Sequence, residues 1–542
     1  MNFHRRLATF LALMLASPLQ AQDAPASAQS FGLSPGPYQV GFGTLQLSDS
    51  TRYTDVDPTI TPGPREITAL VWYPAGPNPP GGRMVYGDYV RLDAVRLGFR
   101  PITENWESVI ENRLLMSYGS DGLTRERLDH ELASATWAFR DARPAAGSFP
   151  LVLYSPGGRD PAWDNSVMAE YLASHGFVVA SVPSRGWYSS ILPYPTGLVG
   201  SAAMAADLET VRQRLRSWPN VDSDRVAVMG FSRGGITNAL MQMRDPSIGA
   251  LVGLDGTIAY RYRFDPVPWS DPATTPGSLE ASGFGQPHRL DVPFLWIGAN
   301  PPDEFRTFFE MDPLFLFWDE LRYSTAYRVE FQQLQHQDFS SAVIRFAPEV
   351  AEIGSARSQE LKNRSYESVA LYVRHFLDGY LKDDDTGIDF LNRSPEENGL
   401  APGTVRVERR RPVGPAPTLS AFRTLLERRG FAAAETIVQD ILDADPTWTL
   451  PEHDLTNWGW TILADGRCGD AVSLLRMAEQ LYTESSEVKT VLGEAHVALG
   501  DRQEGARSYR EAVRLSSGSP LATERLSLLE AGESLPGIVR CN

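Results

Sequence analysis

Short apolar runs alternate with longer amphipathic stretches between residues 150 and 382. The apolar runs are continuous, and the stretches between them repeat apolar residues at positions i, i+3 and i+4. Continuous apolar strands that alternate with helices are typical of a mostly parallel sheet covered on both faces. We therefore predict an α/β fold. The predicted strands are 150–154, 177–182, 225–229, 250–254, 292–297 and 329–334, and the predicted helices are 163–174, 201–217, 234–243 and 366–382.

Two further segments belong to the same predicted domain, 38–393. Helical apolar spacing runs through residues 104–142. An insertion at 300–325 is rich in aromatic residues and is either a lid over the site or additional core. Its aromatic residues include Phe305, Phe308, Phe309, Phe315, Phe317 and Trp318.

The pattern changes after residue 393. Residues 394–417 hold five prolines, which predicts a linker, and the pattern is helical from 418 to 542. Gly459 and Gly493 lie 34 residues apart, as do Ala478 and Ala512. This is the tetratricopeptide period, and small residues at such points let paired helices pack closely. We predict a tetratricopeptide-like domain that offers a surface to a protein partner; the alternative is a plain helical bundle.

The amino-terminal residues have the pattern of a secretory signal peptide. Arg5 and Arg6 precede the apolar run 7–16, and a cleavage site after Ala21 follows. Residues 22–37 are small and polar, which predicts a loose linker. No later stretch approaches the length of a transmembrane helix, so we expect a soluble protein exported to the periplasm or secreted.

Charge and cysteine content narrow the function classes. The formal net charge is −17, which argues against sequence-independent nucleic-acid binding. Cys468 and Cys541 are the two cysteines, and they either form one disulfide or remain free thiols. They are too few for a disulfide scaffold and the wrong set for a zinc site.

The sequence Gly230-Phe-Ser-Arg-Gly follows a predicted strand and precedes a predicted helix. In this context Gly-x-Ser-x-Gly forms a sharp turn that exposes the serine as a nucleophile, so Ser232 is the predicted nucleophile. The N–H of Arg233 then lies at a helix N-terminus, aimed at an oxyanion. The alternative is a glycine-rich turn with an idle serine.

A serine nucleophile needs a base and a carboxylate that orients it. His336 directly follows the last strand and comes after the serine, which makes it the predicted base, with His288 as the main rival. Asp255 and Asp303 follow successive strands, and topology alone leans toward Asp303 as the acid. Gly158 follows the strand 150–154 and is the predicted second oxyanion donor.

Several stretches together resemble α/β-hydrolases of the platelet-activating factor acetylhydrolase type, with dienelactone hydrolase-like enzymes as wider relatives. They are Pro150-Leu-Val-Leu-Tyr-Ser-Pro-Gly-Gly, Leu172-Ala-Ser-His-Gly-Phe-Val-Val-Ala, Gly230-Phe-Ser-Arg-Gly-Gly, Leu254-Asp-Gly and His336-Gln-Asp-Phe. In that family the acid follows the strand next after the nucleophile, a little over twenty residues on. The resemblance therefore implies Asp255, which lies 23 residues after Ser232. The chain departs from the family at Pro156, where a histidine is usual, and at Arg233.

These observations lead to one functional hypothesis with two alternatives. The chain is expected to cleave carboxylic esters through an acyl-enzyme, with no metal or organic cofactor. The resemblance implies short acyl groups on small or phospholipid-like esters, and Trp187 and Tyr188 are candidates for the substrate pocket. One alternative is a polyester- or lactone-cleaving enzyme with the same triad. The other is a non-catalytic scaffold that acts through its helical tail.

Overall fold

The computed structural model describes most of the chain. The described residues are 31–54, 63–77, 79, 82–92, 104–158, 160–184, 197–245, 247–256, 290–299, 318, 321–347, 359–516, 519–539 and 541. The predicted signal peptide 1–21 lies outside these ranges. Trp187, Tyr188, His288 and Asp303 also lie outside them.

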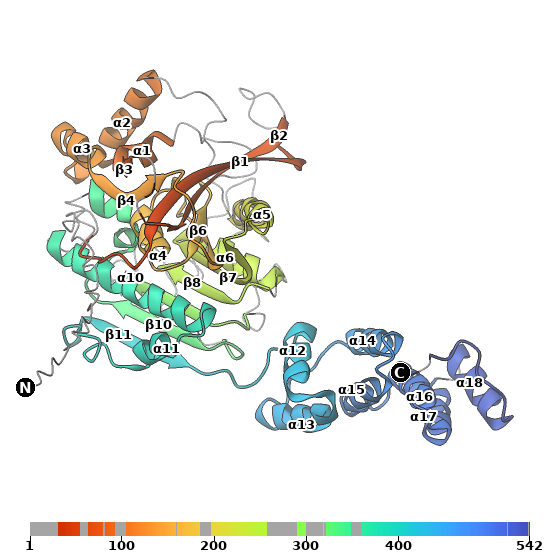
Figure 1. Ribbon diagram of the computed structural model, residues 1–542. Coiled ribbons are helices and arrows are strands. Elements are labelled where there is room, and N and C mark those ends of the chain that lie inside the picture. Colours follow the sequence, from red (N-terminus) through yellow and green to blue (C-terminus); the bar gives the residue numbers. More distant parts are fainter. Residues whose placement is uncertain are drawn as a thin grey trace, which may run out of the picture.

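A single twisted sheet dominates the larger domain (Figure 1). Within the described residues its strand order is β11-β10-β9-β8-β7-β5-β6-β2-β1-β4-β3. The strands from β6 to β10 run parallel to one another, and β2 and β11 flank this block in antiparallel pairing. The strands are β1 Gln39–Thr54, β2 Gly63–Ala75, β3 Arg83–Val85, β4 Ala135–Arg140, β5 Phe149–Ser155, β6 Val178–Ser181, β7 Val221–Phe231, β8 Ala250–Leu254, β9 Phe294–Ala299, β10 Ala326–Phe331 and β11 Val405–Arg410.

Both faces of the sheet are buried. Successive residues of β5 alternate between two hydrophobic clusters, with Leu151 and Leu153 in one and Val152 and Tyr154 in the other. Adjacent strand residues point to opposite faces, so each cluster fills the space on one side of the sheet. A continuous apolar strand is stable only in such a two-sided environment. The α/β fold predicted from the sequence is confirmed, and its topology and covering helices are those of an α/β-hydrolase.

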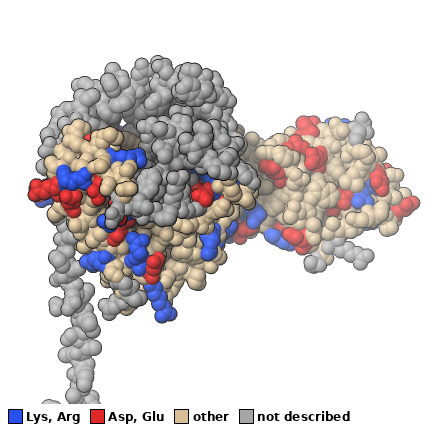
Figure 2. Space-filling model, turned by 90° about the horizontal axis from the view of Figure 1, so that it is seen from above, with Lys and Arg blue, Asp and Glu red and all other residues tan. Residues whose placement is uncertain are grey.

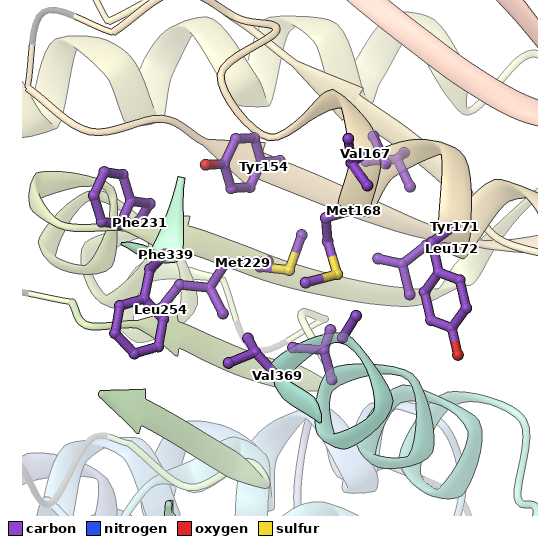
Figure 3. Packing of buried hydrophobic residues seen from close by; sticks show 14 of the residues in the cluster. Tyr154, Val167, Met168, Tyr171, Leu172, Met229, Phe231, Leu254, Phe339 and Val369 are labelled. Atoms are coloured by element: carbon purple, nitrogen blue, oxygen red, sulfur yellow. The ribbon is translucent and has the colours of Figure 1, made fainter. Parts of the chain in front are cut away.

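Helices cover the two faces. Met168 of α4 and Val369 of α10 belong to the cluster on one face, where Figure 3 shows them near Met229 of β7. Helices α5 and α6 contribute Leu208 and Ala239 to the cluster on the other face. The helices of this domain are α1 Tyr86–Arg91, α2 Glu104–Tyr118, η2 Gly119–Asp121, α3 Arg125–Leu132, α4 Ser166–Ser174, α5 Gly197–Leu215, α6 Arg233–Arg244, η7 His336–Phe339, α9 Ser341–Phe346, α10 Gln359–Leu381 and α11 Asp385–Asn392.

Two local predictions need correction. The segment 394–417 is not only a linker, because Val405–Arg410 forms β11 and pairs antiparallel with β10. Its alternating valines bury one face, and the guanidinium of Arg409 donates to the carbonyls of Leu391 and Arg393 at 2.8 and 2.6 Å. Residues 104–142 are not all helical either. They form α2 and α3, and then strand β4.

Two other segments contribute to the core. Phe31 and Leu33 lie in the predicted loose linker 22–37, yet both are buried. The Phe31 ring packs edge-on against Tyr366, so this end of the linker belongs to the domain. In the aromatic insertion, Trp318 and Leu321 belong to the core beneath the sheet, and residues 300–317 lie outside the described chain.

A second, all-helical region follows β11 and extends to one side of the sheet domain (Figure 1). Its helices recur in pairs: α14 and α16 begin 34 residues apart, and so do α15 and α17. A Cβ atom on Gly459 would lie 2.9 Å from the Leu475 side chain, and one on Gly493 would lie 2.6 Å from the Tyr509 ring. The two glycines therefore permit close packing of helices at the predicted interval. The helices are α12 Leu419–Arg429, η8 Phe431–Ala433, α13 Ala434–Ala444, α14 Glu452–Ala464, α15 Cys468–Leu481, α16 Ser486–Ala498, α17 Arg502–Leu515 and α18 Pro520–Glu530.

One disulfide closes the helical region. Cys468 at the start of α15 is bonded to Cys541, 73 residues later, so the open choice between a disulfide and free thiols is resolved as a disulfide. The region contacts the sheet domain through Asp445, which is buried and accepts a hydrogen bond from the Tyr323 hydroxyl at 2.7 Å. Arg322 forms an ion pair with the same carboxylate at 3.2 Å.

Acidic and basic side chains are interspersed over the described surface in the view of Figure 2. None of the helices in the described ranges has the length and apolar character needed to span a bilayer.

Candidate active site

Ser232 occupies a strained position between a strand and a helix. Strand β7 ends at Phe231 and helix α6 begins at Arg233, so Ser232 alone makes the turn. Its backbone has φ 50° and ψ −120°, a conformation that residues with a Cβ rarely adopt and that costs about 1–3 kcal/mol. The Ser232 N–H donates to the Leu254 carbonyl at 3.1 Å, which fixes the turn against β8.

The glycines of the motif are required by packing. A Cβ on Gly230 would lie 2.3 Å from the carbonyl carbon of Gly234, and one on Gly234 would lie 2.1 Å from the carbonyl oxygen of Ser155. Both contacts are with backbone atoms, which cannot move aside as a flexible side chain would. Glycine at positions 230 and 234 therefore lets β5, β7 and α6 approach closely at this point.

The three predicted catalytic side chains form one hydrogen-bonded chain. His336 Nε2 lies 2.9 Å from Ser232 Oγ, and His336 Nδ1 lies 2.6 Å from Asp255 Oδ2. Asp255 follows β8 and His336 begins η7 after β10, so both project from the carboxyl edge of the parallel strands. The tertiary fold thus brings together side chains that are far apart in the chain. Asp255 and His336 are separated by 81 positions, and Ser232 and His336 by 104.

The Asp255 carboxylate is fixed from both sides. The residue is only 3% exposed, and its Oδ1 accepts the Ala299 N–H at 3.1 Å while Oδ2 contacts the histidine. Its own N–H donates to the Ile297 carbonyl at 2.6 Å. A buried carboxylate needs hydrogen-bond donors to be stable. The Asp255 carboxylate has such donors, and they hold it where it can orient the His336 imidazole.

The imidazole of His336 is also held by packing. It stacks on the Phe231 ring with centroids 5.1 Å apart and an interplanar angle of 29°. The turn that carries it is closed by the Gln335 N–H, which donates to Asp338 Oδ2 at 2.8 Å.

Another histidine, His175, lies away from the site. It precedes β6 and is therefore at the opposite edge of the sheet, where burial lowers its pKa.

The chain is similar to chlorophyllases. It is 29% identical over 121 residues to chlorophyllase type 0 from Chenopodium album, a match that covers 20% of this chain and 35% of that protein. It is 35% identical over 112 residues to chlorophyllase-1 from Citrus unshiu and from Citrus sinensis, which covers 20% of this chain and 33% of each. The chain thus spans about a third of the length of these curated relatives.

A solved structure is also similar to this chain. It is a ferulic acid esterase from Streptomyces cinnamoneus, with a TM-score of 0.45 and 20% sequence identity, and the match covers 70% of this chain and 99% of that one. No protein-family model matches the chain.

The two predicted oxyanion donors lie on neighbouring segments. Gly158 follows β5, whose last residue Ser155 pairs with Gly230 of β7, so the loop after β5 borders the turn at Ser232. A Cβ on Gly157 would lie 2.9 Å from the Phe231 ring, which shows how closely this loop approaches. The N–H of Arg233 belongs to the first turn of α6, where backbone donors point out of the helix end.

Sequence reasoning missed a group of buried polar residues beside the site. Asp164 and Asn165, between β5 and α4, are 1% and 2% exposed and bond to Tyr154 and to the segment after His336. Burial raises the pKa of Asp164 well above its ordinary value. Nothing in the local pattern around residue 165 indicates these contacts, because the partners lie far away in the chain.

Among the described residues, no three side chains of the metal-binding types gather as ligands of one ion.

Proposed function

We propose that this protein is a serine hydrolase that cleaves carboxylic esters. The observation that carries the proposal is the continuous hydrogen-bonded chain from Ser232 Oγ through His336 to Asp255, with lengths of 2.9 and 2.6 Å. The strained backbone at Ser232 supports it, since strain of this kind is kept where it serves a function. The sequence similarity to chlorophyllases is compatible with it.

The reaction follows from the positions of the three side chains. Ser232 Oγ attacks the ester carbonyl carbon while His336 Nε2 takes the hydroxyl proton. Asp255 keeps the imidazole in the tautomer that has its proton on Nδ1 and stabilises the imidazolium. The alcohol leaves with the proton from His336, an acyl-enzyme remains, and water activated by the same imidazole releases the acid. The N–H groups of Gly158 and Arg233 are the proposed donors to the oxyanion.

The substrate class and location are part of the same proposal. The resemblance to platelet-activating factor acetylhydrolases suggests short acyl chains on small or phospholipid-like esters. Trp187 and Tyr188 are the proposed pocket residues. The amino-terminal signal pattern supports export to the periplasm or beyond. The alternatives on the same triad are polyesters and lactones.

One experiment tests the activity directly. The protein without residues 1–21 is assayed with p-nitrophenyl acetate, butyrate and octanoate beside Ser232→Ala. Loss of the nucleophile is expected to lower kcat by several orders of magnitude. The chain-length profile then measures the acyl pocket, and a panel of lactones and a polyester film separates the alternatives. Equal inertness of the two folded proteins, with no labelling of Ser232 by a fluorophosphonate, would reject the enzyme and favour a scaffold acting through the helical region.

A further inference from the structure

Asn165 makes an unusually complete set of tertiary hydrogen bonds next to the candidate site. It directly precedes α4, where an asparagine side chain commonly caps the helix, yet its side chain makes no capping bond. The side chain is instead directed into the interior, and the residue is 2% exposed. The Asn165 side chain therefore makes tertiary hydrogen bonds in place of a helix cap.

The carboxamide of Asn165 uses its full bonding capacity. Its Nδ2 donates to the Tyr154 hydroxyl at 2.6 Å and to the Phe339 carbonyl at 2.9 Å. Its Oδ1 accepts the Ser341 N–H at 2.9 Å and the Tyr366 hydroxyl at 2.9 Å. An amide has two donor hydrogens and two acceptor lone pairs, so its orientation is fixed by four partners.

Two of these four bonds end on the segment that carries His336. Phe339 is the last residue of η7, the turn that begins at His336, and Ser341 begins the next helix. The neighbouring residue Asp164 adds to this contact, because its carbonyl accepts the Ala342 N–H at 2.8 Å. The other two bonds reach Tyr154 in β5 and Tyr366 in α10, which are parts of the rigid core.

The histidine turn is closed on itself at its start and anchored to the core at its end. At its start the Gln335 N–H donates to Asp338, and at its end the backbone is bonded to Asn165. The imidazole must keep contacts of 2.6 and 2.9 Å on its two nitrogens at once. A displacement of about 1 Å at a reacting group costs roughly 100-fold in rate. A looser turn would therefore lower kcat more than it would change KM.

We propose that Asn165 is a positioning residue that fixes the turn carrying His336 between Ser232 and Asp255. The proposal rests on the proposed ester hydrolase function. It assigns Asn165 no contact with the substrate or with the reacting atoms. Its effect passes through the backbone of residues 339–341 to the imidazole.

The test compares Asn165→Ala with Tyr154→Phe in p-nitrophenyl butyrate hydrolysis. Tyr154→Phe removes the hydroxyl that accepts from Asn165 Nδ2 and donates to Asp164 Oδ2, but it leaves both bonds from Asn165 to the histidine segment, which makes it a control for general destabilisation. We expect Asn165→Ala to lower kcat by about 10- to 100-fold with KM changed less than threefold. Fluorophosphonate labelling of Ser232 should slow in parallel. Tyr154→Phe should lower the melting temperature but keep kcat within threefold of wild type.

Asn165→Asp provides a second measurement, because it keeps the side-chain volume and the acceptor for the Ser341 N–H but loses the donors to Phe339 and to Tyr154. It should retain more kcat than Asn165→Ala. Three outcomes overturn the proposal: wild-type kcat in both Asn165 variants, a loss confined to KM, or an equal loss of kcat in Tyr154→Phe. In each of these cases Ser232→Ala stays inactive and the proposed function stands. Wild-type turnover no higher than that of Ser232→Ala would instead reject the function and the positioning role together.

Discussion

The strain at Ser232 makes a quantitative prediction about stability. The backbone there has φ 50° and ψ −120°, which glycine adopts without penalty and which costs other residues about 2 kcal/mol. Glycine also gives the unfolded chain more freedom, which costs roughly 0.7 kcal/mol. The difference leaves Ser232→Gly about 1 kcal/mol more stable than Ser232→Ala. Both variants lose Oγ and its bond to His336, so the comparison isolates the backbone.

Urea unfolding at 25 °C, followed by circular dichroism, measures this difference. A matched pair at Ser217 serves as the control, because that residue is exposed and its φ is not positive. There glycine should be less stable than alanine by about 0.4–1 kcal/mol, because alanine fits that backbone and restricts the unfolded chain more. The two sites should therefore give opposite signs, and both Ser232 variants should be inactive. A Ser232→Gly protein less stable than Ser232→Ala would refute the argument that the turn is strained.

Three further predictions concern the acid, the disulfide and a buried carboxyl group. Asp255→Asn should lower kcat by about 10³- to 10⁴-fold in ester hydrolysis, whereas Asp303→Asn should leave it near wild type; the reverse result would make Asp303 the acid. Replacing Cys468 and Cys541 by alanine opens a loop of 73 residues and should cost about 4 kcal/mol in urea unfolding of the helical region. Dithiothreitol should produce a similar loss in wild type and none in the double variant, and a double variant as stable as wild type would contradict the estimate. Burial raises the pKa of Glu170 from 4.5 to about 7, so wild type should lose up to about 3 kcal/mol as the pH rises from 4.5 to above 7. Glu170→Gln should remove that part of the pH dependence in unfolding curves at pH 4.5 and 8, and an unchanged slope would show that the carboxyl does not titrate there.

The parts of the site that could be predicted are those defined by local geometry. Gly230 and Gly234 reveal the turn because a tight strand-to-helix connection excludes a Cβ at both places. His336 could be chosen because it comes just after the last predicted strand, 329–334, which overlaps the end of β10. The continuous apolar runs predicted the central strands, because burial on both faces of a sheet favours apolar residues at successive positions.

The parts that could not be predicted depend on long-range contacts. Topology alone leans toward Asp303 as the acid, whereas the family resemblance implies Asp255, and it is Asp255 that contacts the histidine. Topology alone could not decide, because which strand end faces the histidine is a property of the assembled sheet. Asn165 has partners as far as 201 residues away, so no window of sequence contains its role. Strand β11 was missed because prolines surround it, although Val405 and Val407 carry the alternation of a half-buried strand.

Strand β11 also determines where the sheet domain and the helical region can be separated. It covers the outer edge of β10 along six paired residues, from Ala326 with Arg410 to Phe331 with Val405. A break at residue 393 would uncover that edge, and exposed edges recruit strands from other molecules. The uncovered strand would be β10, which leads to the turn that carries His336. The same break would therefore cause both aggregation and loss of activity. Any exchange of helical tails, in evolution or by design, therefore has its natural junction in the few residues between Arg410 and Thr418.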